Sequence, residues 1–124
     1  MRIRSLLFSA TAALLASCNP FGACTLIGCD DGLLVQFNRP PAGAFRIEAT
    51  VPNDPGIVAI ECADAASCPL MFSGLVAEQV TLRLITAQGT VTQQFQPRYQ
   101  EVHPNGRGCG PECRQATVTF QLPA

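Results

Sequence analysis

Hydrophobic and polar side chains alternate along much of the chain after Gly32. Between residues 45 and 51 every second residue is apolar, and the residues between them are Arg, Glu and Thr. Most of residues 79–86 and 116–122 follow the same period of two. Successive side chains of a strand point to opposite faces, so this pattern predicts strands with one buried and one solvated face. The side chains expected inside are Phe45, Ile47, Ala49, Val51, Val80, Leu82, Leu84, Val118, Phe120 and Leu122.

Further short runs rich in β-branched and aromatic residues are separated by Pro, Gly and Asn. The sequence Ala87-Gln88-Gly89 is short enough to turn a hairpin, with Gly89 free to take a positive φ. No segment shows a sustained helical period, so we expect little helix. Short strands at this spacing predict an all-β, seven-stranded antiparallel β-sandwich held by disulfides. The predicted strands are residues 33–37, 45–51, 57–62, 70–72, 79–86, 90–96 and 116–122.

The first residues follow a different pattern. A basic start, Met1-Arg2-Ile3-Arg4, precedes an uncharged apolar run over residues 5–16. That run is too short for the roughly 20 residues that a membrane-spanning helix needs, so it is typical of an export signal that is removed. The run ends in Leu15-Ala16-Ser17-Cys18. This tetrapeptide resembles the lipobox of bacterial lipoproteins at all four positions.

The resemblance covers residues 1–18 and implies cleavage before Cys18, a thioether-linked diacylglycerol on its sulfur and N-acylation of the new terminus. Two or three acyl chains would anchor the protein stably in a membrane. Ordinary secretion, with Cys18 as a simple thiol, is the alternative. In the lipoproteins of enteric bacteria, Asp after the lipidated Cys retains the protein in the inner membrane; Asn19 departs from that signal and favours the outer membrane.

These patterns divide the chain into a signal peptide (residues 1–17), a lipidated Cys with its tether (18–29) and one β-sandwich domain (30–124). The strand number and lengths resemble those of immunoglobulin-like domains and of the transthyretin-like fold found in carboxypeptidase regulatory domains. The Cys, Trp and Cys arrangement of antibody domains is absent, since the chain has no Trp. The resemblance therefore concerns architecture, because a fold by itself does not imply a function.

The sequence has seven Cys, and assigning Cys18 to lipid leaves an even set. In an exported protein such a set predicts disulfides, each contributing about 2 to 4 kcal/mol to stability. Cys62 and Cys68 flank a short loop and are expected to pair. The others either form two local bridges or cross-link the two ends of the domain, and the cross-links are favoured because longer loops restrict the unfolded chain more. These four cysteines are Cys24, Cys29, Cys109 and Cys113.

Composition narrows the classes of function. Without residues 1–17 the chain keeps six Arg and nine Asp or Glu, a formal charge of −3. The Arg residues are scattered, which argues against nucleic-acid binding. The absence of Lys excludes Schiff-base chemistry and the lysine-dependent phosphate loop.

The segment 97–115 is the best candidate for a binding site. It is long, rich in Pro and Gly, and contains two cysteines. Connections longer than about 12 to 15 residues are uncommon in compact domains and are often functional. The alternative is a decorated loop that needs disulfides because it has no core of its own. The side chains that it would present to an envelope protein or a polysaccharide are Arg98, Tyr99, His103, Arg107 and Arg114.

Enzymatic and metal chemistry have less support. The Ser residues after Cys18 lie in no nucleophile-elbow motif, and Asp30 and Asp31 are adjacent, which would place their carboxylates on opposite faces of a strand. The main alternative function is a metal- or redox-active envelope protein using His103 with Cys109 and Cys113, although Cys-x3-Cys fits no common zinc module. We therefore predict a non-catalytic binding or structural module without a cofactor. Calcium at loops of the sandwich would use Asp30, Asp31, Asp54 and Asp64, but no twelve-residue calcium loop is present.

Overall fold

The computed structural model describes residues 24–123, and this part of the chain contains strands and no helix. Cys18 and the signal-like segment lie outside the described residues. Within residues 24–123, nothing meets the length and apolarity required of a membrane-spanning helix. The elements are β1 (Gly32–Phe37), β2 (Phe45–Thr50), β3 (Val58–Cys62), β4 (Met71–Ser73), β5 (Val80–Thr86), β6 (Gly89–Phe95), β7 (Gln100–Val102) and β8 (Cys113–Phe120).

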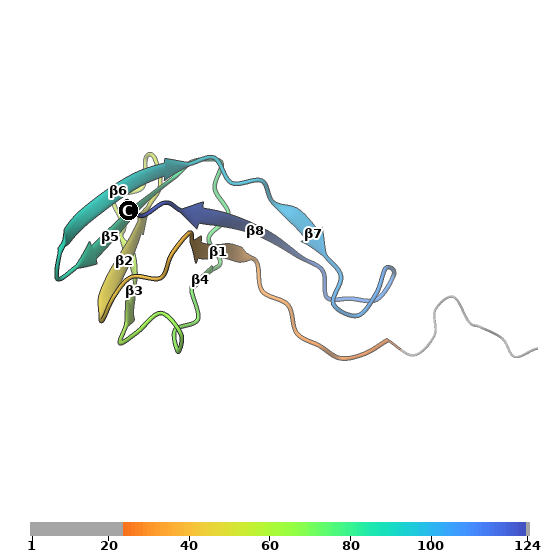
Figure 1. Ribbon diagram of the computed structural model, residues 1–124. Helices are drawn as coiled ribbons and strands as arrows, with labels where there is room; N and C mark the ends of the chain where they lie inside the picture. The colour runs from red at the N-terminus through yellow and green to blue at the C-terminus, as the bar shows by residue number, and fades with distance from the viewer. Residues whose placement is uncertain (1–23, 124) are drawn as a thin grey trace, which may run out of the picture.

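The strands form two four-stranded sheets, ordered β4-β1-β8-β7 and β3-β2-β5-β6 (Figure 1). Their inward-facing side chains share one apolar core, as the alternating pattern predicted. Leu33, Phe72 and Phe120 of the first sheet and Ile47 and Leu82 of the second are almost completely buried. The all-β prediction with two sheets is therefore confirmed.

Two details of the predicted topology are wrong. The domain has eight strands, because β7 lies inside the segment expected to be a loop. In addition, β1 and β8 pair in parallel, with Leu33 opposite Ala116 and Phe37 opposite Phe120. Parallel neighbours need a long crossover connection, and here the whole second sheet lies between the two strands in the sequence.

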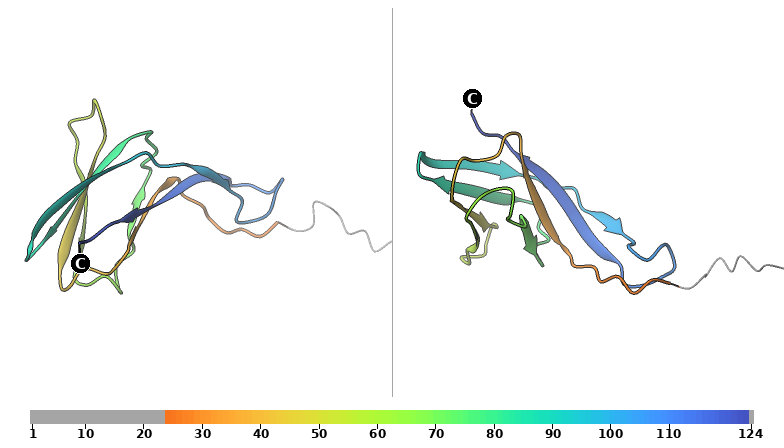
Figure 2. Two further views of the ribbon diagram at one scale, coloured as in Figure 1. Left: turned by 45° about the horizontal axis from the view of Figure 1, so that its top comes forward. Right: turned by 60° about the horizontal axis from the view of Figure 1, so that its bottom comes forward.

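The β5–β6 hairpin forms where it was predicted, with Thr86 opposite Gly89. Gly89 has a φ of 136°, a conformation that a side chain at this position would strain. The hairpin turn lies at one end of the molecule, and β7, the start of β8 and the segment 24–29 lie at the other (Figures 1 and 2). One end of the domain is therefore a hairpin turn, and the other brings together β7, the start of β8 and the first described residues.

Candidate functional site

The segment 97–115 contains a pair of antiparallel strands joined by a structured connection, and we call this segment the arm. β7 pairs antiparallel with the start of β8, so Gln100 lies opposite Gln115 and Val102 lies opposite Cys113. Residues 103–112 connect the two strands. Backbone hydrogen bonds from Gly106 N–H to His103 O (3.0 Å) and from Cys109 N–H to Gly106 O (3.2 Å) fold this connection back on itself. We call residues 103–112 together with residues 24–29 the locked end.

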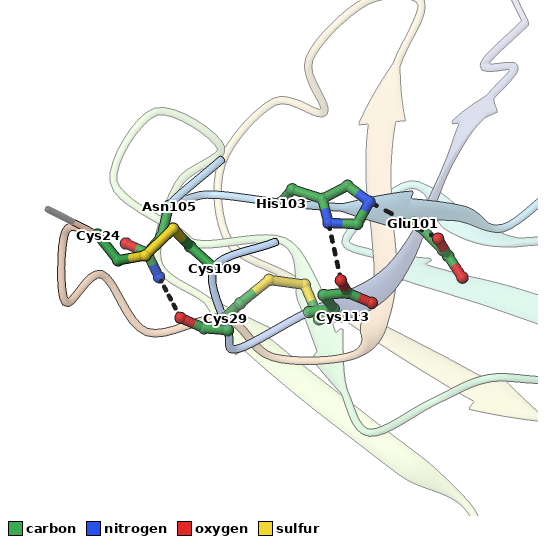
Figure 3. A network of polar contacts seen from close by, with 9 residues as sticks. Cys24, Cys29, Glu101, His103, Asn105, Cys109 and Cys113 are labelled. Carbon is green, nitrogen blue, oxygen red and sulfur yellow. Dashed lines mark hydrogen bonds and ion pairs between the residues drawn. A yellow bond between two sulfur atoms is a disulfide. The ribbon is translucent and has the colours of Figure 1, made fainter. Parts of the chain in front are cut away.

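Two disulfides fasten residues 24–29 to the rest of the domain, one to the connection 103–112 and one to the first residue of β8 (Figure 3). Cys24 is bonded to Cys109 and Cys29 to Cys113, across 85 and 84 residues of sequence. Cys62 at the end of β3 and Cys68 in the following loop form the third disulfide, across 6 residues. These are the cross-linked ends and the local bridge that the sequence analysis favoured. Residues 24–29, which we assigned to the tether, are therefore fastened to the domain.

Asn105 provides a polar clamp between the same two parts. It is the one buried polar side chain found in residues 24–123, with 8% of its surface exposed. Its Oδ1 accepts hydrogen bonds from Thr25 Oγ1 (2.6 Å) and Ile27 N–H (2.8 Å). Its Nδ2 donates to Ile27 O (2.8 Å) and Gly110 O (3.1 Å). The side chain therefore has partners for both of its polar atoms, which is what makes its burial tolerable.

His103 lies between two carboxylates. Its Nδ1 is 3.3 Å from Glu112 Oε1, and its Nε2 is 3.6 Å from Glu101 Oε2 (Figure 3). The Nδ1 atom is buried, and its contact with Glu112 lacks hydrogen-bond geometry. Each carboxylate faces a different ring nitrogen, so the two contacts involve different atoms of the imidazole.

Glu101, His103 and Glu112 each offer one atom that could bind a metal ion, and these three atoms lie within 4.8 Å of one another. Among the described residues, this is the group of His, Cys, Asp or Glu side chains that meets this condition. One ion can bind only one nitrogen of an imidazole, so Glu101 or Glu112 would have to turn to complete a site. Cys109 and Cys113 are disulfide-bonded and offer no thiolate. The His103 and cysteine ligand set of the alternative hypothesis is therefore not available in this oxidised form.

Tyr99 and Arg114 form a contact pair at the base of the arm. The Tyr99 hydroxyl accepts a hydrogen bond from Ala77 N–H (3.0 Å) and donates to Leu75 O (3.4 Å). The Arg114 guanidinium carbon lies 5.7 Å from the centroid of the Tyr99 ring, within the range of a cation–π contact. Tyr99 thus ties the arm to the β4–β5 connection as well as presenting its ring. Among the five candidate side chains, those of Arg98, Arg107 and Arg114 are exposed, whereas Tyr99 and His103 are partly buried.

Three of the four aspartates considered for calcium accept hydrogen bonds through a side-chain oxygen. Asp31 Oδ1 accepts from Arg114 N–H (2.6 Å) and Asp54 Oδ1 from Gly56 N–H (2.8 Å). Asp64 Oδ1 accepts from the hydroxyl and the backbone N–H of Ser67, and both bonds lower the pKa of Asp64. These aspartates lie in different loops, and together with Asp30 they form no ligand cluster within residues 24–123.

The opposite end of the domain has a shallow groove of about 510 Å³. Residues 39–42, the β5–β6 turn and Leu122 line it. Arg39 is the one titratable side chain in this lining, so the groove lacks a pair of groups that could exchange protons. It offers a surface for contact and no arrangement suited to general acid–base chemistry.

Comparisons with protein-family models, with curated proteins and with solved structures found no match. We therefore infer a function from the sequence and from the geometry of the locked end.

Proposed function

We propose that the protein is a small bacterial cell-envelope lipoprotein, anchored through an acylated Cys18 and acting as a non-catalytic binding or structural module. The observation that carries the proposal is the use of the seven cysteines. Three disulfides take six of them, and the seventh is the Cys of Leu15-Ala16-Ser17-Cys18. Disulfides are typical of exported proteins, which agrees with the export signal. Asn19 supports the outer membrane as the destination.

The two-sheet architecture is consistent with a binding or structural module, although a fold does not by itself imply a function. Two four-stranded sheets around one core support the resemblance to immunoglobulin-like or transthyretin-like domains. The parallel pairing of β1 with β8 must also be present in any immunoglobulin-like or transthyretin-like domain to which this fold is compared in detail.

An envelope protein or a polysaccharide is the proposed partner, bound by the segment 97–115. Two disulfides and the Asn105 clamp hold this segment in one conformation, so a partner would lose little free energy to ordering it. Arg98 and Arg114 are exposed, and Arg and Tyr are residue types that interfaces favour. The Arg114–Tyr99 pair is therefore the proposed centre of the contact.

The alternative is a metal- or redox-active protein that uses His103 with Cys109 and Cys113. It requires these cysteines to be thiols in the native protein. Oxidised cysteines would leave Glu101, His103 and Glu112 as the ligands for a metal.

The intact mass of the protein extracted from native membranes tests the anchor and the alternative together. Free thiols are blocked first, and the mass is then measured with and without reduction. We expect a chain that begins at Cys18, carries acyl chains and has six oxidised cysteines. The Cys18→Ser variant is the control and should lose the acyl mass. An unlipidated wild-type chain would contradict the anchor, and blocked thiols at Cys109 and Cys113 would favour the alternative.

Site-specific photo-crosslinking in cells tests the binding surface. A photoreactive residue at position 98 or 114 should give an adduct with a protein or glycan. The matched control is position 92, an exposed Thr on β6 in the other sheet. Equal adducts at positions 92, 98 and 114 would rule out segment 97–115 as a specific binding surface.

A further inference from the structure

The locked end exposes apolar side chains that are not part of the hydrophobic core. Leu26 has 97% of its surface exposed and Ile27 has 54%. Residues 24–27 carry no charge. The backbone of Ile27 is nevertheless held by Asn105, and Cys24 is bonded to Cys109. These apolar side chains are therefore presented on a rigid support.

The length of chain between this support and the proposed anchor is short. Six peptide steps separate Cys18 from Cys24. Even a fully extended chain rises only about 3.3 to 3.6 Å per residue, so six residues reach about 20 Å at most. If Cys18 carries lipid, Cys24 cannot lie further than that from the point of acyl attachment. The Cys24–Cys109 bond imposes nearly the same limit on the connection 103–112.

We propose that the locked end rests on the bilayer, with Leu26 and Ile27 entering the boundary between headgroups and acyl chains. This inference depends on the lipidation proposed above, because the lipid supplies the first attachment. The apolar pair supplies a second attachment beside it, and two attachments fix an orientation that one flexible tether would leave free.

The orientation has a consequence for the rest of the domain. The β5–β6 turn lies at the end of the molecule away from the segment 24–29 (Figures 1 and 2). It would point away from the bilayer, together with the groove lined by Arg39 and Gly89. The tip of the connection 103–112 would face lipid, and the Arg114–Tyr99 pair at the base of the arm would remain accessible to a partner.

Tryptophan fluorescence can test this directly because the chain has no Trp. Leu26→Trp places the single probe at the locked end. Gln88→Trp is the matched control, at an exposed position in the β5–β6 turn. Each full-length lipidated variant is purified from membranes and inserted into phosphatidylcholine vesicles, with or without brominated acyl chains that quench Trp on contact.

We expect the Leu26→Trp emission to shift to the blue in vesicles and to lose most of its intensity when the lipids are brominated. The Gln88→Trp emission should show neither change. Equal quenching of both probes, or of neither, would overturn the proposed orientation. Uncharged lipid is used so that the quenching reports entry of the apolar pair and not attraction of the exposed Arg107 to anionic headgroups, and added salt should leave the quenching unchanged.

Two further measurements separate this inference from the proposed function. The mass of each variant reports lipidation, and flotation with the vesicles reports anchoring. A protein that is neither acylated nor floats would refute the lipoprotein proposal. A protein that is acylated and floats, yet shows no quenching of Leu26→Trp, would refute the orientation alone.

Discussion

The two ends of the domain are stabilised by different kinds of interaction. The end formed by β2, β5 and the β5–β6 hairpin owes its order to buried apolar side chains such as Ile47, Leu82 and Leu84. The locked end has few buried apolar side chains and is held by two long-range disulfides and by Asn105. The comparison shows how a small domain can extend a structured arm beyond its core, because covalent bonds and one satisfied polar side chain replace burial.

Removing both long-range disulfides should have the largest effect. Either bridge alone closes the same large loop, so the second one closes only a small ring. We expect Cys29→Ser with Cys113→Ser to cost about 3 kcal/mol, and removal of the Cys24–Cys109 bridge as well to cost about 4 to 5 kcal/mol more. The sum is comparable to the whole stability of a small domain.

Urea unfolding followed by circular dichroism measures these free energies. The control is Cys62→Ser with Cys68→Ser, which opens a loop of 6 residues and should cost only about 2 kcal/mol. Equal costs for the first and second long-range bridges would show that the two do not share one loop in the unfolded state. The stability of the locked end would then depend less on its two disulfides than we propose.

Phe120→Ala should have the next largest effect, on the core. The Phe120 side chain is fully buried, and its ring centroid lies 6.0 Å from that of Phe37 and 6.2 Å from that of Phe95. Because Phe95 belongs to the other sheet, the ring joins the two layers. We expect a loss of about 3 to 5 kcal/mol in unfolding free energy. Thr119→Ala, at an exposed neighbouring position, is the control. If Phe120→Ala lost no more unfolding free energy than Thr119→Ala, the ring would not have this role.

The sequence predicted the apolar part of the fold well because its signal is local. Alternation over residues 45–51 and 79–86 follows from the strand's period of two, and the structure confirms Ile47 and Leu82 as core residues. β7 was missed because Gln-Glu-Val has two polar residues and no alternation to detect. The parallel pairing of β1 and β8 depends on the path of the whole chain, which no local pattern records.

The locked end could be predicted only in part, for the same reason. Chain entropy favoured the cross-linked cysteines, and that choice agrees with the structure. The role of Asn105 depends on partners 80 and 78 residues away, Thr25 and Ile27, and its own surroundings suggest only a turn. Tyr99 was predicted as a binding residue, and its hydrogen bonds to Leu75 and Ala77 add a structural role that the sequence did not indicate.

Asn105→Ala should have an intermediate effect, confined to the locked end. The substitution removes both hydrogen bonds to the Ile27 backbone and leaves its N–H without a protein partner. We expect a loss of about 1 to 3 kcal/mol and faster amide hydrogen exchange at Ile27. Thr25→Ala removes only one bond of the clamp and should preserve the protection of Ile27. If Ile27 exchanged at the same rate in Asn105→Ala as in the wild type, the disulfides alone would hold this segment.

The smallest expected effect concerns Asp64, in the loop closed by Cys62 and Cys68. The Ser67 hydroxyl, followed by the Ser67 backbone N–H, lowers the Asp64 pKa below its usual value of 3.8. A lowered pKa means that the folded state favours the carboxylate. The contribution to stability is then present above the pKa of the unfolded chain and is lost as the pH falls through the lower pKa of the folded state.

Ser67→Ala should raise the Asp64 pKa toward its usual value without reaching it, because the backbone N–H still donates. Carboxyl ¹³C NMR titration measures this shift, and the same titration of Asn105→Ala should leave the Asp64 midpoint unchanged. A change there would mean that the two ends are coupled, whereas independence would show that the local bridge and the locked end are separate structural units.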